Sequence, residues 1–296
     1  MIGGGFQNEM RANFDPLLAD LDEATDLGVL VAGGYGLFLK QQWLLQNPQI
    51  PIIISLDQWQ DFVPRVTKDL DLVLSLQLIA SADAQQSILG VLTKHQFTVS
   101  DRNPRWQFVK MLPAGRTIMV ELHAPLPTIG IQGLVADRIR LKRKPSLGDA
   151  GIHGRTNPEA VGCDLHPLRF EQNGFAYHVP NPLTWSIMKL TAAQDRWQRS
   201  MSVQHAEGDR AFSREQAIKH IGDACRIVAM VTRDENDQIP DVAAVIKASE
   251  QFQKAAEIVA LSFPEEDGWM SQVLANHWNS AHLTMIRNTL VRWFHG

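Results

Sequence analysis

The stretch Arg65-Val-Thr-Lys-Asp-Leu-Asp-Leu-Val-Leu-Ser-Leu76 places two carboxylates, Asp69 and Asp71, at the start of an apolar run. In a β-strand successive side chains point to opposite faces, so the two carboxylates share one face and Leu70 and Leu72 the other. Two carboxylates on one face repel each other unless a cation lies between them, and hard oxygen ligands suit Mg²⁺. The pair predicts a Mg²⁺ site, although Asp-x-Asp also occurs at the polar edge of ordinary strands.

Two glycines precede this strand in Val29-Leu-Val-Ala-Gly-Gly-Tyr-Gly-Leu-Phe-Leu-Lys40. Gly33 and Gly34 stand between an apolar strand pattern and a helical one. Glycine lets the backbone approach a ligand closely, and the free N–H groups at a helix start form an anion site suited to a triphosphate. A Gly-Gly pair can equally be a tight turn, so the order of glycines and then carboxylates is what favours a nucleotide site.

A third carboxylate, Glu121, lies within the apolar pattern of residues 117–124. Strand alternation puts Glu121 and His123 on one face and Val120 and Leu122 on the other. Burying an unpaired carboxylate is costly, and two metal ions bridged to Asp69 and Asp71 would supply a partner. We expect Glu121 as a third metal ligand and His123 as a rim or packing residue.

The periodicity of the chain predicts an α+β protein with two domains. Residues 1–180 mix strand patterns with helical ones, whereas the pattern from Pro182 onward is helical. We place the boundary at the turn-forming Val-Pro-Asn-Pro of residues 179–182, which predicts a mixed-sheet domain over 1–180 and a helical domain over 181–296. Strands are expected at 28–33, 70–76, 105–112 and 117–124, and helices at 16–27, 35–45, 78–95, 184–198, 213–232 and 241–263.

Composition excludes several classes of protein. The 296 residues are 45% hydrophobic and 20% charged, which is ordinary for a globular chain. No apolar stretch reaches the length of a membrane span and the N-terminus lacks the order of a signal peptide, so we expect a cytoplasmic protein. Cys163 and Cys225 have no disulfide or zinc spacing and are expected to be reduced and structural.

The charge balance bears on nucleic-acid binding. A net charge of −4 gives no global attraction for nucleic acid, so any contact must be local. The one dense basic run lies within residues 138–144. This run is either a substrate-binding patch or, more simply, a solvated strand end.

A Gly-Gly turn that opens a helix, followed by an Arg-x-Thr-x-Asp-x-Asp strand, resembles the signature of DNA polymerase β-like nucleotidyltransferases. Within that superfamily, residues 179–196 resemble the Pro-led helix of the AbiEii-type abortive-infection toxin group, and residues 219–228 resemble its later helix. The resemblance covers about residues 28–230. Two features depart from the pattern: the 35-residue spacing between Gly34 and Asp69 is long, and Tyr35 stands where a small or hydroxyl residue is common.

The resemblance implies roles for individual residues. Gly33 and Gly34 would cradle the nucleotide phosphates, and Asp69 and Asp71 would hold Mg²⁺. Lys189 would reach the triphosphate, and Asp223 would lie near the substrate side of the cleft. Arg65 and Thr67 match the signature, and Arg65 would help to balance the triphosphate charge. Beside these, helix geometry puts Arg196 on the same face as Lys189, and Glu121 or a water would assist the ion at the nucleophile.

The implied reaction transfers a nucleoside monophosphate from a nucleoside triphosphate to a hydroxyl acceptor, with release of pyrophosphate. By analogy with the group, the first expected acceptor is a tRNA 3′ end, and the protein would be the toxin of a toxin–antitoxin pair with a cognate antitoxin partner. Two alternatives stay open. One is a nucleotidyltransferase acting on a small hydroxylated molecule, and the other is a non-catalytic module that binds a nucleotide or a partner.

Overall fold

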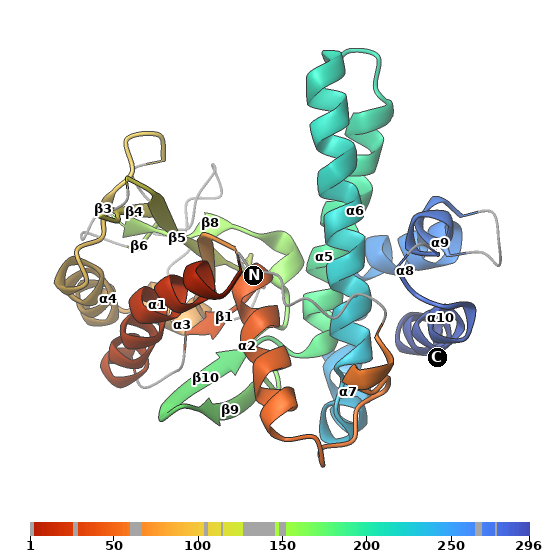
Figure 1. Cartoon of the computed structure of the whole chain (residues 1–296), viewed down its shortest axis with the longest axis horizontal. Coiled ribbons are helices and arrows are strands. Elements are labelled where there is room, and N and C mark those ends of the chain that lie inside the picture. Colours follow the sequence, from red (N-terminus) through yellow and green to blue (C-terminus); the bar gives the residue numbers. More distant parts are fainter. Residues whose placement is uncertain are drawn as a thin grey trace. The chain divides into compact units, whose positions relative to one another are not determined.

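The computed structural model of the chain is an α+β structure (Figure 1). It describes residues 3–25, 29–59, 67–103, 106–113, 115–126, 146–147, 152–263, 268–275 and 277–296. The chain divides into two compact units: Met1–Trp43 with Arg65–Pro180, and Leu44–Pro64 with Asn181–Gly296. Among the helices in these ranges, none combines the length and apolarity needed to cross a membrane.

The first unit contains a mixed β-sheet of eight described strands, in the order β3-β4-β5-β2-β1-β10-β9 with β8 beside β5. The strands are β1 (Leu30–Val31), β2 (Asp69–Val73), β3 (Thr98–Val99), β4 (Gln107–Met111), β5 (Thr117–Ala124), β8 (Arg155–Thr156), β9 (Leu168–Gln172) and β10 (Phe175–Val179). Strand β2 runs parallel to β5 and antiparallel to β1, and β1 runs parallel to β10. A separate two-stranded ladder joins β6 (Ser146–Leu147) to β7 (Ile152–His153).

The helices of the first unit are α1 (Gly3–Thr25), the first part of α2 (Gly33–Gln46), α3 (Leu76–Ala80) and α4 (Ala82–Lys94). Helix α1 packs against α4 and β10. Tyr35 of α2 is buried and donates a hydrogen bond from its hydroxyl to Asp15 Oδ1 of α1, at 2.6 Å. Burial, followed by the charge of Asp15, raises the pKa of Tyr35, which keeps the phenol protonated as a donor. The unusual tyrosine after the glycines thus joins two helices.

Two elements of the first unit differ from the sequence expectation. Helix α1 begins at Gly3 instead of residue 16 and continues through Pro16, because Phe14, Leu17 and Leu21 bury one face of the helix around the proline. The β9–β10 hairpin was not predicted. Its turn, Asn173-Gly174, has positive φ at both residues, which is the Asn-Gly signal of a two-residue hairpin.

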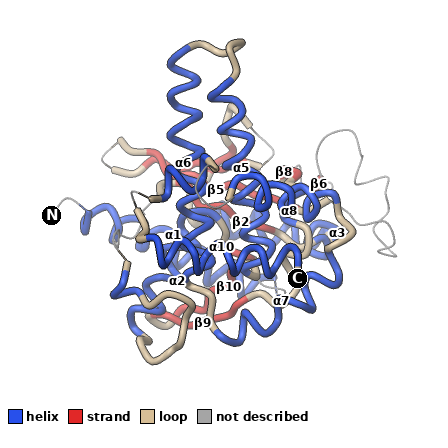
Figure 2. Tube along the Cα trace, turned by 90° about the vertical axis from the view of Figure 1, so that its right-hand side faces the viewer, coloured by secondary structure: helices blue, strands red, loops and turns tan. Residues whose placement is uncertain are grey.

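The second unit is built from helices α5 (Pro182–Met201), α6 (Glu207–Ala229), α7 (Arg233–Ile246), α8 (Glu250–Ser262), α9 (Trp269–Leu274) and α10 (Ser280–His295). Helices α5 and α6 lie side by side along their length, as the two views agree (Figures 1 and 2). Helix α5 begins where expected, because Asn181 Oδ1 accepts a hydrogen bond from Thr184 N at 2.8 Å and Pro182 occupies the first turn.

The helix expected over residues 241–263 is two helices. Helix α7 starts earlier, at Arg233, where Thr232 and Glu235 form a capping box, and it ends at Ile246. Helix α8 begins at Glu250 because Ser249 caps it, with its hydroxyl accepting from Phe252 N. Periodicity alone did not show this break.

The range 1–180 expected for the first domain differs from the structure in one segment. Residues 44–64 belong to the second unit. Ile53 N and Ile54 N donate to the carbonyl oxygens of Val231 and Ala229, both at 3.1 Å, and the ring of Trp59 packs edge-on against Trp278. These contacts join the segment to the helices although it lies far from them in sequence.

Candidate functional site

The two aspartates of β2 share one face, as their spacing predicted. Leu70 and Leu72 are fully buried, whereas Asp69 and Asp71 are partly exposed. Strand β2 pairs with β5 in parallel, and the register places Asp71 opposite Glu121. The same face of two neighbouring strands therefore carries three carboxylates.

A cluster of Asp71, Glu121 and His123 forms at this point. His123 Nε2 lies 3.3 Å from Asp71 Oδ1 and 3.5 Å from Glu121 Oε2. One ligand atom from each of the three residues lies within 4.8 Å of the others. The cluster thus offers two carboxylates and an imidazole to one position.

Neighbouring side chains orient Glu121. The Gln107 amide donates a hydrogen bond to Glu121 Oε1 across the β4–β5 ladder, and Asn103 Nδ2 donates to Gln107 Oε1 at 2.7 Å. Arg155 of β8 approaches the other oxygen, with Nη1 3.7 Å from Glu121 Oε2. Such outer partners are what hold a metal-binding carboxylate in one orientation.

Asp69 lies in an electrostatically unfavourable position. Its Oδ1 is buried without a hydrogen-bond partner among the residues that the structure describes. Burial, then the negative charge of Asp71, raises the pKa of Asp69; Lys68 opposes this and Glu121 adds to it. A buried carboxylate oxygen in a field of like charge fits a bound cation, which would supply both the missing partner and the missing charge.

The glycine turn at the start of α2 packs directly against this strand. Gly33 has φ +63°, and a methyl group there would lie 1.9 Å from Asp71 Oδ2. A methyl group on Gly34 would lie 2.7 Å from Thr67 Cγ2. Glycine at position 33 lets the start of α2 pack against Asp71, and the first N–H groups of α2 lack intrahelical acceptors.

Thr67 holds the start of β2. Its Oγ1 accepts a hydrogen bond from Asp69 N and donates one to Asp69 O, both at 3.0 Å. This closed contact fixes the backbone of Asp69. The structure therefore shows Thr67 orienting the carboxylate strand.

Lys189 and Asp223 lie in the second unit, where they form a buried ion pair. Lys189 Nζ donates to Asp223 Oδ2 at 2.9 Å, and the residues are 8% and 2% exposed. Arg196 lies two turns beyond Lys189 on α5 and is partly exposed. Arg65 lies outside the described residues, as does the basic run of residues 138–144.

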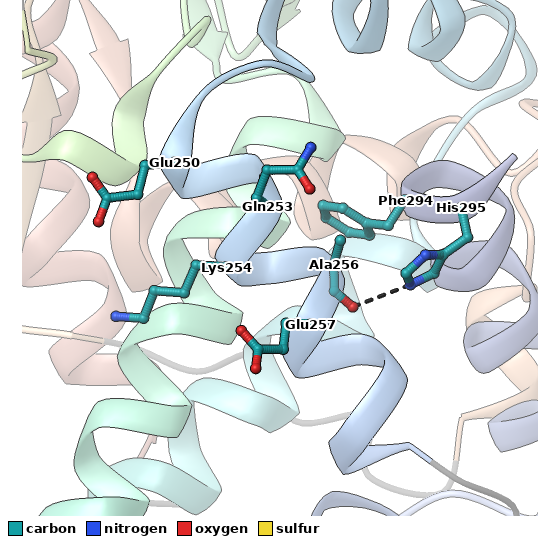
Figure 3. A pocket seen from close by; sticks show the side chains of 7 residues that line it. All are labelled: Glu250, Gln253, Lys254, Ala256, Glu257, Phe294 and His295. Atoms are coloured by element: carbon teal, nitrogen blue, oxygen red, sulfur yellow. Dashed lines mark hydrogen bonds between the residues drawn. The ribbon is translucent and has the colours of Figure 1, made fainter.

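A hollow in the second unit lies between α8 and α10 (Figure 3). It is lined by Glu250, Gln253, Lys254, Ala256, Glu257, Phe294 and His295. His295 Nε2 donates to Ala256 O at 3.1 Å, and Lys254 pairs with Asp195 of α5 at 3.1 Å. The charges are of both signs and mostly solvated, and none of the predicted site residues lines this hollow.

The sequence analysis expected His123 as a rim or packing residue and did not single out Gln107 or Arg155. His123 had a usable signal, since it lies one strand period after Glu121 on the same face. Gln107 reaches Glu121 through the pairing of β4 with β5, two predicted strands joined by Pro-Ala-Gly. Arg155 reaches it through the pairing of β8 with β5, which local sequence does not encode.

Comparison of the chain with protein-family models, with curated proteins and with solved structures finds no match. The functional interpretation therefore depends on the geometry of the site and on the sequence pattern.

Proposed function

We propose that the chain is a divalent-cation-dependent nucleotidyltransferase with a nucleotidyltransferase-like fold, using Mg²⁺ or a similar ion. The observation that carries the proposal is the contact between the Gly33 turn and Asp71, with Glu121 in register on the next strand. A helix start that attracts anions thereby adjoins a carboxylate group that attracts a cation. This combination suits a nucleoside triphosphate complexed with a metal ion.

The site residues of the first unit have separate roles in this proposal. Asp69, Asp71 and Glu121 hold the cation, and the N–H groups at Gly33 and Gly34 receive phosphate oxygens. A bound Mg²⁺ would neutralise triphosphate charge and make the acceptor hydroxyl more acidic. The roles proposed for Arg65, Lys189, Arg196 and Asp223 rest on the family resemblance.

The proposed acceptor is a tRNA 3′ end, and the proposed context is the toxin of a toxin–antitoxin pair in the cytoplasm. Both rest on analogy with the AbiEii-type group. A small hydroxylated acceptor and a non-catalytic nucleotide-binding module are the other outcomes that the following experiment can return.

The test incubates the protein with each α-labelled nucleoside triphosphate, Mg²⁺ and total tRNA, beside the variants Asp71→Asn and Asp101→Asn. Asp101 is an exposed loop residue outside the cluster, so its variant is the matched control. We expect label on RNA with the wild type and the control. Asp71→Asn should lose about 10²-fold to 10³-fold or more in rate, because metal stabilisation of transition-state charge contributes several kcal/mol.

The negative outcomes separate the alternatives. Transfer of label to a small molecule in a deproteinised cell extract, with none to RNA, would replace the tRNA acceptor by a small one. Binding of the triphosphate without transfer to any acceptor would support the non-catalytic module. A thermal unfolding curve for Asp71→Asn at or above that of the wild type shows that the loss of activity is not a loss of folding.

A further inference from the structure

His123 belongs to the carboxylate cluster by position and by burial. The side chain is 8% exposed and comes from β5, two residues after Glu121. Its Nε2 atom points between the two carboxylates, at 3.3 Å from Asp71 Oδ1 and 3.5 Å from Glu121 Oε2. An imidazole serving only as packing would not need to direct a ring nitrogen at two acids.

These separations suit three ligands of one ion. Ligands bound at about 2.1 Å in octahedral geometry are about 3 Å from their neighbours, close to the spacing around His123. The Gln107 amide donates to Oε1 of Glu121, which leaves Oε2 for the cluster. Asp69 Oδ1 is not one of the three clustered ligand atoms, but it is buried without a partner among the described residues on the same strand face. It is an independent sign that a cation belongs beside this face.

The two ring nitrogens of His123 have different surroundings. Its Nδ1 atom is buried and has no hydrogen-bond partner within the described part of the chain. Without an ion, Nε2 donates to Asp71 Oδ1 at 3.3 Å and carries the proton. An ion between the carboxylates would take over this contact, with the proton on Nδ1 and the Nε2 lone pair directed at the ion.

The type of ligand atom decides which ion the site binds more tightly. Carboxylates suit Mg²⁺ and Mn²⁺ alike, whereas imidazole nitrogen is a ligand for first-row transition ions and contributes little to Mg²⁺. We infer that His123 Nε2 is a direct ligand in this site and gives it a preference for Mn²⁺ over Mg²⁺. This inference rests on the proposed function for its role in catalysis, but the ion preference can be measured without turnover.

Arg155 is the competing cation for Glu121. Its guanidinium lies 3.7 Å from Glu121 Oε2, but the Arg155 side chain is 59% exposed. An exposed ion pair of this kind contributes little, so a divalent ion can displace it. Arg155 would then be available to the phosphates of a nucleotide.

The experiment measures Mn²⁺ binding from the loss of the free-ion electron paramagnetic resonance signal, and Mg²⁺ binding by competition against Mn²⁺. It compares the full-length wild type with His123→Gln and with His277→Gln, an exposed histidine of the second unit. We expect the Kd for Mn²⁺ to rise about tenfold or more in His123→Gln. The Kd for Mg²⁺ should change by about threefold or less, because the glutamine oxygen remains an acceptable hard ligand.

Two results would overturn the inference. One is a similar rise in the Kd for Mn²⁺ and the Kd for Mg²⁺ in His123→Gln with an unchanged unfolding midpoint, which indicates that His123 only holds the carboxylates in place. The other is an unchanged Kd for both ions in His123→Gln. Thermal unfolding of His123→Gln accompanies both titrations, so that a folding defect is recognised by weakened binding of both ions and a lowered midpoint.

The label-transfer assay, run with each ion, distinguishes this inference from the proposed function. Transfer that is equally supported by both ions and insensitive to His123→Gln would overturn the ligand assignment and keep the transferase. Selective, His123-dependent Mn²⁺ binding without transfer to any acceptor would support the ligand assignment and overturn the transferase.

Discussion

At the scale of single residues, the absence of a side chain at Gly33 leaves room for the carboxylate of Asp71. The variant Gly33→Ala puts a methyl group 1.9 Å from Asp71 Oδ2 at a positive φ, so either the turn or the carboxylate must move. We expect a loss of about 1–3 kcal/mol in the free energy of unfolding. Divalent-ion binding should be lost with it. Urea denaturation and the Mn²⁺ titration measure the two effects.

Gly90→Ala is the matched control for this variant. Gly90 lies inside α4, and no described atom beyond its own turns of the helix lies within 4 Å of an added methyl group. Alanine should therefore stabilise the protein by about 0.5–1 kcal/mol, because a helix favours it over glycine. Equal effects of the two variants would contradict the close approach at Gly33.

His178 makes stability depend on pH. Burial lowers the pKa of this histidine below 6.5; Asp22 opposes the shift and Arg169 adds to it. Between the lowered value and 6.5 the unfolded state binds more protons, so stability rises with pH through that window and falls on acidification. The free energy of unfolding at pH 5.5 and 7.5 should therefore differ more in the wild type than in His178→Gln. An unchanged difference would exclude His178 as the cause.

At the scale of elements, the Lys189–Asp223 pair joins α5 to α6. Removing the lysine by Lys189→Met leaves the carboxylate of Asp223, at 2% exposure, without this cation. We expect the free energy of unfolding to fall, because a buried carboxylate loses an ion-pair partner. Replacing both residues, with Lys189→Met and Asp223→Leu together, should cost much less because no charge stays buried.

A double-mutant cycle in urea measures this coupling. A coupling energy of about 0.5–3 kcal/mol is expected for residues in contact. Additive losses would indicate that each side chain acts through other partners. A stable double variant also permits a direct test of nucleotide binding, which separates a phosphate contact of Lys189 from its structural role.

The elements that sequence reasoning predicted well are those whose pattern is local. The alternation in β2 and β5 gave the faces of Asp69, Asp71 and Glu121, because each strand has one buried face. The β9–β10 hairpin had a local signal, Asn173-Gly174, that was overlooked. The start of α1 and the break between α7 and α8 were not predicted, since they depend on burial around Pro16 and on a single serine cap.

The residues that form the site were predictable only in part, because some of them are brought together by strands distant in sequence. Asp71 and Glu121 become neighbours through the register of two strands that are distant in sequence. Arg155 reaches the same carboxylate through the two-residue strand β8, whose pairing with β5 has no sequence signature. Side chains supplied by long-range pairing are therefore the ones that single-sequence reasoning misses.

At the scale of the whole molecule, the units are not continuous in sequence. Residues 44–64 leave the first half of the chain and join the helices of the second unit. A boundary at the Pro-rich turn of residues 179–182 marks a change of pattern along the chain, but it does not reveal a segment that crosses over. Any fragment cut at residue 180 separates this segment from its partners.

The crossing segment should therefore be required for the stability of the helical unit. Ile54 and Trp59 are 1% and 6% exposed, and Trp59 packs on Trp278. The fragment 181–296 alone should bind a hydrophobic dye and unfold with low cooperativity. The same fragment with residues 44–64 attached through a flexible linker should unfold cooperatively at a higher urea midpoint.

The attached segment also provides its own control. Ile54→Ala and Trp59→Ala in the linked fragment should each cost about 2–5 kcal/mol, since both delete large buried side chains. Replacing the exposed Gln58 by alanine in the same fragment should change the midpoint little. If the fragment 181–296 alone matches the linked fragment in midpoint and binds no dye, residues 44–64 do not stabilise the helices. Their assignment to the second unit would then be a matter of proximity, and the fragment cut at residue 180 would be a sound starting point for binding studies.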